Sequence, residues 1–220
     1  MKVRLIIQGP YYYGNDISTL KCIKSALDSE LFSSICLSTY DTPELKKIKH
    51  LNIEIITNDD PGCESYDPYR RCYNNNNRQT VSLASAVLED KFDITIKIRS
   101  DSFIKDCNKL KRILEDFMSS SHDFLFCDTT SVDYKISYQR ILYHLSDWVI
   151  GFKRGQDIIM KSLPLEDEKK DTDWVLNLTS PLKEEFHAKQ GSIRYGTEQW
   201  IILNIFHLIM IFLPLFLIIY

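Results

Sequence analysis

The sequence predicts an α/β domain with a mostly parallel, twisted sheet flanked by helices, a Rossmann-like arrangement. Apolar residues recur at every second position in several short runs. Stretches with apolar residues three and four positions apart separate these runs. Polar residues and carboxylates gather where the runs end. Strands that alternate with helices at this spacing are typical of an α/β fold.

Composition narrows the class of protein. The 220 residues are 44% hydrophobic and 26% charged, as expected for one globular domain. The formal net charge is −3, so no basic surface and no nucleic-acid partner are expected. None of the six cysteines forms a CxxC pair, and we expect reduced thiols in a cytoplasmic protein.

The first half of the chain predicts three strands and one helix. A strand at 2–8 ends at Gly9 and Pro10. A helix follows, with Asn15 or Asp16 as its N-cap and a periodic apolar stripe. The stripe consists of Leu20, Ile23, Leu27 and Leu31. A second strand is predicted at 34–40. After a short charged segment, strict alternation predicts a third strand at 51–57, which the turn 58–62 ends.

The second half predicts two more strands. Val81, Ala84 and Leu88 form a helical stripe before a strand in which Ile94, Ile96 and Ile98 alternate with polar residues. This alternation indicates a strand with one buried face. A helix near 108–119 and a strand at 123–129 follow. After Tyr134 the periodicity loosens and predicts no further strand.

The strand ends carry the functional argument. Ligands bind open α/β sheets at the carboxyl ends of the strands. Here these ends are polar, at 8–10, 38–41, 58–60 and 99–101. Such an edge suits a ligand with base, ribose and phosphate groups. The alternative left open is that strands commonly end in polar turns.

Several common motifs are missing from the sequence. It contains no GxGxxG after the first strand, no GxxxxGK[ST], no HExxH and no GxSxG. These absences disfavour a dinucleotide fold of the usual kind, a P-loop, a zinc protease and an α/β-hydrolase.

Six segments resemble those of a known family, in the same order. They are LIIQGP, NDDPG, NNNNRQTVSLASAV, KIRSDSFI, HLSDWVIGF and RYGTEQW. In these segments the chain resembles the WavE-type lipopolysaccharide-synthesis proteins, bacterial glycosyltransferases of the GT-A type, over about residues 3–200. The resemblance implies a GT-A-like domain at 1–199. It also implies transfer of a sugar from a nucleotide-sugar donor to a saccharide or lipid-linked saccharide of the cell surface.

The resemblance gives the end of the central strand a role. GT-A enzymes carry Asp-x-Asp there, which binds a divalent metal on the donor diphosphate, and this chain has Arg99, Ser100 and Asp101. Asp101 is the expected ligand for Mn²⁺ or Mg²⁺. Two alternatives stay open: Arg99 stabilises the diphosphate directly, or Arg99 and Asp101 form a structural ion pair.

The same geometry predicts further donor-binding residues at strand ends and at one helix start. They are Gln8, Gly9, Pro10, Asp59, Asp60, Asn77 and Arg78. The first three are expected to border the base. The two aspartates are expected to accept hydrogen bonds from the base or ribose, and the last two to hold a phosphate or carbonyl.

An inverting transferase needs a general base for the acceptor hydroxyl. Asp147, beside Trp148, is the first candidate, because an aromatic residue next to a carboxylate suits a sugar ring. Glu198 is the second. The alternative for each is a structural role at a helix or strand start.

Residues 200–220 form a hydrophobic C-terminal segment without a charged residue, for which we expect an apolar helix. Two interpretations stay open. The helix anchors the protein to the membrane with the domain in the cytoplasm, or it is the core helix of a truncated chain.

Two rival functions remain. A nucleotidyltransferase shares the sheet-edge nucleotide site but normally has a basic, glycine-rich loop after the first strand, and QGPYYYGND has no basic residue. A non-catalytic, nucleotide-sugar-binding remnant is favoured by the missing aspartate.

Overall fold

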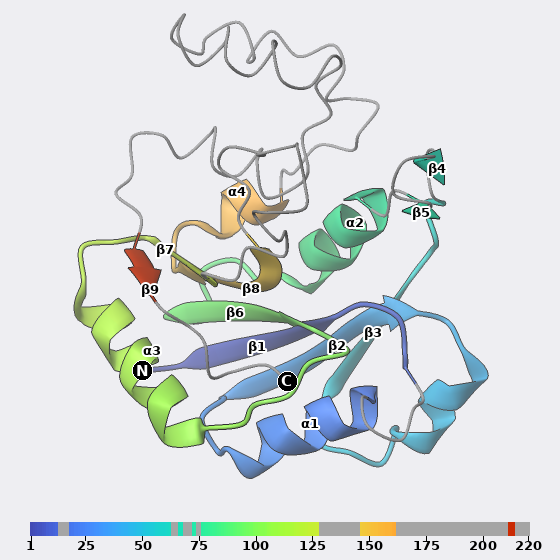
Figure 1. The fold of residues 1–220 in the computed structure, drawn as a ribbon, viewed down its shortest axis with the longest axis horizontal. Coiled ribbons are helices and arrows are strands. Elements are labelled where there is room, and N and C mark those ends of the chain that lie inside the picture. Colours follow the sequence, from blue (N-terminus) through green and yellow to red (C-terminus); the bar gives the residue numbers. More distant parts are fainter. Residues whose placement is uncertain are drawn as a thin grey trace, which may run out of the picture.

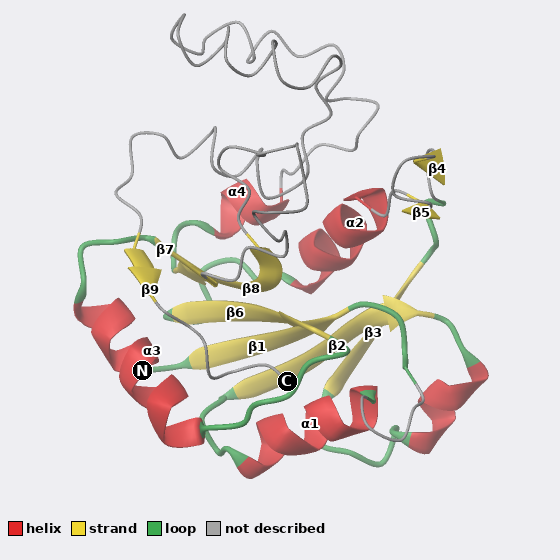
Figure 2. Cartoon of the chain, in the orientation of Figure 1, coloured by secondary structure: helices red, strands yellow, loops and turns green. Residues whose placement is uncertain are grey.

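A computed structural model describes residues 1–12, 18–62, 66–67, 72–73, 76–127, 146–161 and 211–213. Within them a seven-stranded sheet has the strand order β3-β2-β1-β6-β8-β7-β9 (Figures 1 and 2). The strands are β1 (Val3–Gln8), β2 (Ser34–Tyr40), β3 (Glu54–Asn58), β6 (Ile94–Arg99), β7 (Phe124–Cys127), β8 (Ser146–Lys153) and β9 (Ile211–Leu213). A separate antiparallel pair joins β4 (Tyr66–Asp67) to β5 (Cys72–Tyr73).

The helices cover both faces of the sheet. They are α1 (Thr19–Asp28), the 3₁₀ helix η1 (Pro43–Lys47), α2 (Asn76–Ala86), α3 (Cys107–Ser119) and α4 (Asp157–Lys161). Figure 1 shows α1 and α3 against one face, and α2 and α4 against the other. The predicted fold class, an α/β domain with a mostly parallel sheet, is therefore confirmed.

The chain reverses direction across the sheet between β1 and β6. From β1 it moves outward through β2 to β3, and it then returns to place β6 on the other side of β1. These four strands pair in parallel, Leu5 lying beside Ile35 on one side and beside Ile96 on the other. The reversal creates a crevice at the carboxyl ends of β1 and β6, the place where open α/β sheets bind ligands.

The strand β8 was not predicted. It runs antiparallel between β6 and β7, and Gly151 pairs with both Ile96 and Leu125. A β-carbon on Gly151 would lie 3.0 Å from the Ile96 side chain and 3.1 Å from that of Leu125. The strand is covered on both faces, so its sequence shows no period-2 alternation.

The predicted C-terminal helix is wrong at the three residues of its segment that the structure describes. Ile211–Leu213 form β9, a strand parallel to β7. Residue 214 is proline, which disfavours helical geometry in the residue before it. An uninterrupted apolar run also carries no period by which helix and strand could be distinguished. The remainder of 200–220 lies outside the described residues. No helix among those described is long and apolar enough to cross a membrane.

The helix α1 begins two or three residues later than predicted. Its N-cap is Ser18, whose side chain accepts a hydrogen bond of 3.2 Å from the backbone N–H of Lys21. The predicted caps, Asn15 and Asp16, lie outside the described residues, and the assignment of the cap to them is wrong. Ser18 has the extended backbone of an N-cap residue and leads directly into the buried stripe.

We expect Ser18→Ala to lower the free energy of unfolding by about 1 kcal/mol, because one backbone N–H of the first turn loses its acceptor. Urea denaturation measures the change. Ser33→Ala, at an exposed serine just before β2, is the control and should leave stability unchanged. Equal stability of the two variants would contradict the capping role.

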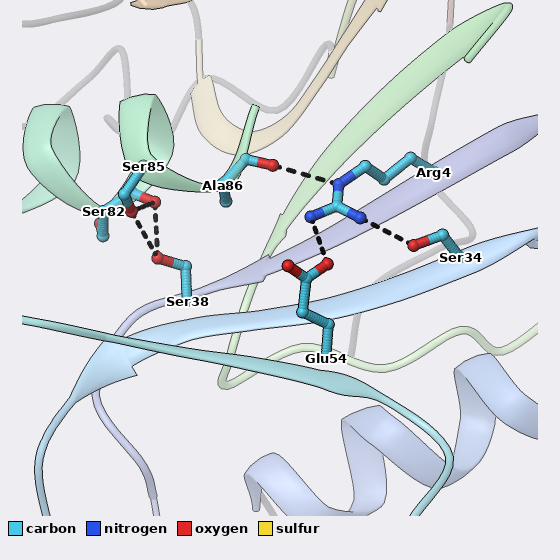
Figure 3. Close-up of polar contacts among 7 residues, drawn as sticks. All are labelled: Arg4, Ser34, Ser38, Glu54, Ser82, Ser85 and Ala86. Carbon is cyan, nitrogen blue, oxygen red and sulfur yellow. Dashed lines mark hydrogen bonds and ion pairs between the residues drawn. The ribbon is translucent and has the colours of Figure 1, made fainter. Parts of the chain in front are cut away.

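A buried polar cluster lies between the sheet and α2 (Figure 3). The Arg4 guanidinium is 1% exposed and donates to Ser34 Oγ at 2.7 Å, to Glu54 at 2.8 Å and to the carbonyl of Ala86 at 3.1 Å. It thereby ties β1, β2 and β3 to the C-terminal end of α2. A cation at that end of a helix also interacts favourably with the helix dipole.

A second group of contacts fixes the middle of α2. Ser38 Oγ of β2 donates to the carbonyl of Ser82 at 2.6 Å and lies 3.3 Å from Ser85 Oγ (Figure 3). The amide of Gln8 on β1 donates to Ser82 Oγ and to the carbonyl of Gln79. These bonds hold the N-terminal half of α2 above the ends of β1 and β2.

Candidate functional site

The ends of β1, β2 and β6 are joined by hydrogen bonds. The N–H of Ser100 donates to the carbonyl of Gln8 at 2.8 Å, and its hydroxyl donates to the carbonyl of Pro10 at 2.8 Å. The N–H of Gly9 donates to the carbonyl of Ser38 at 3.2 Å. Gly9 has a φ of +128°, a conformation that side-chain-bearing residues rarely adopt. The glycine therefore allows the ends of β1 and β6 to meet closely.

A pocket of about 380 Å³ opens at this junction. Its walls come from the ends of β1, β2 and β6, from the segment after β3 and from α2. The lining residues are Gln8, Gly9, Pro10, Tyr12, Tyr40, Asp60, Arg78, Gln79, Ser82, Lys97, Arg99, Ser100 and Asp101. The volume lies within the range of small-ligand sites, at about 300–1,000 Å³.

Most of the residues that the sequence singled out for donor and metal binding line this one pocket. They are Gln8, Gly9, Pro10, Asp60, Arg78, Arg99, Ser100 and Asp101. Two others do not line it. Asp59 is exposed next to Asp60, and Asn77 is buried at the start of α2.

Of the two candidate bases, the structure describes only the backbone of Asp147. The backbone of Asp147 belongs to β8, although its side chain is outside the described residues, as is the whole of Glu198. Since β8 is antiparallel to β6 and Val149 pairs with Ile98, the first residues of β8 lie at the sheet edge where β6 ends. Residue 147 is therefore at the same edge as the pocket.

A two-bond ion pair joins Arg78 of α2 to Asp60 beyond β3. The guanidinium donates to both carboxylate oxygens, at 2.7 and 2.6 Å, and the N–H of Gly62 donates to the same carboxylate at 2.9 Å. The hydrogen bonds from Arg78 are the main reason that the pKa of Asp60 lies below its usual range. The pair connects the loop after β3 to α2 at the pocket mouth.

A second pair of the same form joins Arg99 to Asp101. The guanidinium donates to the two carboxylate oxygens at 2.9 and 2.6 Å. The side chains are partly exposed, at 35% and 23%. Both carboxylates of the pocket lining are thus engaged by an arginine.

This arrangement does not fit a divalent ion at the position predicted for one. Mn²⁺ and Mg²⁺ require several oxygen ligands. Both oxygens of Asp101 already accept hydrogen bonds from Arg99, and those of Asp60 accept from Arg78. Across the part of the chain that the structure describes, no three His, Cys, Asp or Glu side chains are grouped to hold a metal. The structural ion pair considered for Arg99 and Asp101 is the arrangement present.

Two aromatic residues of the pocket were not singled out by the sequence analysis. The Tyr40 hydroxyl donates to the carbonyl of Arg78 at 2.8 Å, and burial raises its pKa to about 12, so it remains a hydrogen-bond donor. Tyr12 is 43% exposed and lies just after β1. The available signal was position: Tyr40 is the last residue of the strand predicted at 34–40, and Tyr12 follows the turn after the first strand.

Lys97 is a further pocket residue that sequence reasoning missed, together with Gln79 and Ser82 of α2. On β6, Ile94, Ile96 and Ile98 pack into the core shared with α1 and α3, so Lys97 faces α2. It is 2% exposed. The sequence predicted one buried face for this strand, but Thr95 and Lys97 on the other face are buried as well, and that expectation is wrong.

We expect Arg78→Met to raise the pKa of Asp60 toward its ordinary value of 3.8. The folded-state pKa is depressed, so the ion pair contributes stability above the ordinary pKa and loses it as pH falls through the lowered value. NMR titration of the carboxyl carbons measures this. Asp93 is the internal control, because its pKa is lowered chiefly by the backbone N–H of Lys2 and should not change. An unchanged Asp60 pKa would contradict the pairing.

Comparison with known proteins gives a family and a fold. The family model described as WavE lipopolysaccharide synthesis matches residues 3–211. No curated protein sequence matches the chain. Similar solved structures include the bifunctional IspDF from Campylobacter jejuni, with 12% identity and a TM-score of 0.50 over 97% of this chain and 49% of that chain.

Two further structures are similar at lower TM-scores. TarS 1–349 from S. aureus has 16% identity and a TM-score of 0.43 over 70% of this chain and 47% of that chain. Rv0371c from Mycobacterium tuberculosis H37Rv, in complex with manganese, has 10% identity and a TM-score of 0.45 over 82% and 84%. The chain spans about half the length of IspDF and of TarS 1–349. At these identities the likeness concerns the fold alone.

Proposed function

The chain belongs to the WavE lipopolysaccharide synthesis family, and from this premise we propose that it transfers a sugar from a nucleotide-sugar donor to a lipopolysaccharide or another surface-glycan acceptor in the cytoplasm. The observation that carries the proposal is the pocket at the junction of β1 and β6. It stands at the reversal of strand order, where open α/β sheets bind nucleotides.

The pocket offers chemistry for each part of such a donor. Tyr12, partly exposed, provides an aromatic face for the base, beside the backbone of Gly9 and Pro10. Arg78 and Arg99 present planar guanidinium groups, which match phosphate oxygens. Asp60, at the mouth, is an acceptor for ribose hydroxyls.

The reaction breaks the bond between the anomeric carbon and the phosphate oxygen of the donor. The acceptor hydroxyl oxygen forms the new bond, its proton passes to a general base, and the nucleotide leaves with the bonding electron pair. Cations at the phosphates stabilise the charge that develops on the leaving group. Asp147 is our first candidate for the base, since its backbone lies at the pocket edge of the sheet, and Glu198 is the second.

Incubation of the purified chain with UDP-, GDP-, CMP- and dTDP-sugars and a lipopolysaccharide acceptor tests the proposal. We expect one donor to release its nucleotide in an acceptor-dependent manner. A parallel reaction with nucleoside triphosphates and sugar 1-phosphates detects the nucleotidyltransferase alternative by pyrophosphate release. Donor binding without release under all conditions would instead identify a nucleotide-sugar-binding remnant.

The candidate bases are tested by Asp147→Asn and Glu198→Gln. We expect the variant that lacks the base to lose activity by about 100-fold or more while it still binds the donor. Asp116→Asn, at an exposed aspartate on α3, is the matched control and should retain full activity. Full activity in both test variants would remove these two residues from the mechanism.

A further inference from the structure

We propose that Gln8 is a specificity-determining residue of the pocket, and that its side-chain oxygen, Oε1, accepts a hydrogen bond from a ring N–H of the donor's nucleobase. Uracil, thymine and guanine carry such an N–H, whereas cytosine and adenine have an acceptor nitrogen in its place. The identity of the ligand as a nucleotide rests on the proposed function. The sequence led us to expect Gln8 near the base, but it gave no role to either polar atom of the amide.

The amide of Gln8 is held in one orientation by α2. Its nitrogen, Nε2, donates to the carbonyl of Gln79 at 2.5 Å and to Ser82 Oγ at 2.9 Å. Ser82 Oγ is free to accept this bond because its own hydrogen is donated to the carbonyl of Arg78 at 2.6 Å. A flipped amide would bring the oxygen of Gln8 against the carbonyl oxygen of Gln79, and two acceptors repel each other. The N–H groups of Gln8 therefore point to α2, and Oε1 points away from these two acceptors.

The oxygen of the Gln8 amide is an unused acceptor. Among the residues that the structure describes, none donates a hydrogen bond to it. Gln8 is 4% exposed and lines the pocket. In the described part of the chain, four side-chain atoms are sealed from solvent without a partner, and Oε1 is not one of them. Oε1 is therefore open to the pocket, where a ligand that donates a hydrogen bond would satisfy it.

An acceptor at this depth distinguishes the parts of a nucleotide sugar. Phosphate oxygens are themselves acceptors, so Oε1 repels them. The transferred sugar must stay accessible to the acceptor saccharide, so a residue that is 4% exposed is a poor partner for it. The ribose hydroxyls have an acceptor in Asp60, whose side chain is 47% exposed at the pocket mouth. The base remains, since it carries N–H donors and can be enclosed.

Tyr12 provides a surface on which such a base can stack. Its backbone is fixed to the start of α1, because its N–H donates to Thr19 Oγ1 at 2.8 Å and its carbonyl accepts from the N–H of Thr19 at 3.2 Å. Thr19 is buried, whereas Tyr12 is 43% exposed and lines the same pocket as Gln8. A base that stacks on an aromatic ring keeps its polar edge free for a hydrogen bond. The pocket thus offers a stacking face and a fixed acceptor.

Nucleoside diphosphates are the probes, titrated into the full chain by calorimetry. We expect UDP, dTDP or GDP to bind more tightly than CDP and ADP. Methylation of the ring N–H, at N3 of UDP or dTDP or at N1 of GDP, should weaken binding of the preferred ligand about tenfold or more, because the hydrogen bond is lost. In Gln8→Met, which has a thioether in place of the amide, most of this difference should disappear.

Ser38→Ala is the matched control. It removes a different bond to α2, from Ser38 Oγ to the carbonyl of Ser82 at 2.6 Å, and leaves the amide of Gln8 in place. This variant should keep the preference for the unmethylated ligand. If Gln8→Met does not fold, Ser82→Ala releases one N–H of the Gln8 amide and should reduce the preference. An equal loss of preference in Ser38→Ala would assign it to the packing of α2 and overturn the role of Gln8.

Three results with the wild-type protein would also overturn the inference. They are tightest binding of CDP or ADP, equal affinity for the methylated and unmethylated ligands, and no binding of any nucleoside diphosphate. Binding with the expected preference but without turnover of any nucleotide sugar would support the role of Gln8 and overturn the proposed function. Turnover of a nucleotide sugar without the preference would do the reverse.

Discussion

Gly9→Ala is expected to destabilise the protein and to disrupt the pocket. The residue has a φ of +128°, and an alanine in such a conformation costs about 1–2 kcal/mol. Its β-carbon would lie 2.7 Å from Ser100 Oγ. That hydroxyl is buried and donates to the carbonyl of Pro10, so it cannot turn aside without losing its hydrogen bond. Overpacking of this kind adds about 1–3 kcal/mol.

Urea denaturation of a double-mutant cycle separates the two contributions. Gly155→Ala is the matched control, because Gly155 has a φ of +90° and no atom within 4 Å of an added β-carbon, so only the backbone cost applies. Ser100→Ala removes the clashing hydroxyl and should offset part of the cost of Gly9→Ala. Equal losses for Gly9→Ala and Gly155→Ala, with no coupling to Ser100, would show that close approach of the strand ends is not required.

Glu54→Leu is expected to lower the free energy of unfolding by about 2–3 kcal/mol. The substitution leaves the guanidinium of Arg4, which is 1% exposed, without its carboxylate. Removal of one partner from a fully buried ion pair costs about 3–5 kcal/mol. We expect less here because the Glu54 side chain is 45% exposed and Arg4 keeps its bonds to Ser34 and Ala86.

The double variant Arg4→Met with Glu54→Leu should be markedly more stable than Glu54→Leu alone. Replacement of a buried ion pair by apolar residues of similar size is often neutral or stabilising. Urea denaturation of the four proteins of the cycle measures the coupling. Glu44→Leu, at a glutamate of η1 outside the cluster, is the control and should change stability little. Additive losses from the two single substitutions would show that Arg4 and Glu54 are not coupled.

Prediction from sequence succeeded where one face of an element is apolar and the other polar. The stripe near 108–119 matches α3 (Cys107–Ser119), which buries Leu110, Ile113, Leu114 and Phe117. It failed for β8, in which Gly151 packs between β6 and β7 with both faces covered. No period remains in a strand that is buried on both sides.

The candidate site likewise contains residues that the sequence predicted and residues that it missed. The residues directly after β1 and β6 were identified from their position, because strand ends of a parallel sheet meet at one edge. Lys97 and Tyr40 were missed for different reasons. Lys97 occupies a polar position of an alternating strand, which the pattern alone assigns to solvent. Tyr40 is the last residue of β2, and nothing local shows that its hydroxyl reaches the carbonyl of Arg78.

The sequence by itself determined most of the local elements and the positions of their polar ends. These depend on contacts between residues close along the chain and on the side-chain period of helix and strand. The tertiary structure decided the strand order that brings Gly9 beside Ser100, and the burial of Lys97 between Ile6 of β1 and Ile150 of β8. These features depend on contacts between residues distant along the chain, such as Ser100 and Pro10, which are 90 positions apart, and no local pattern encodes them.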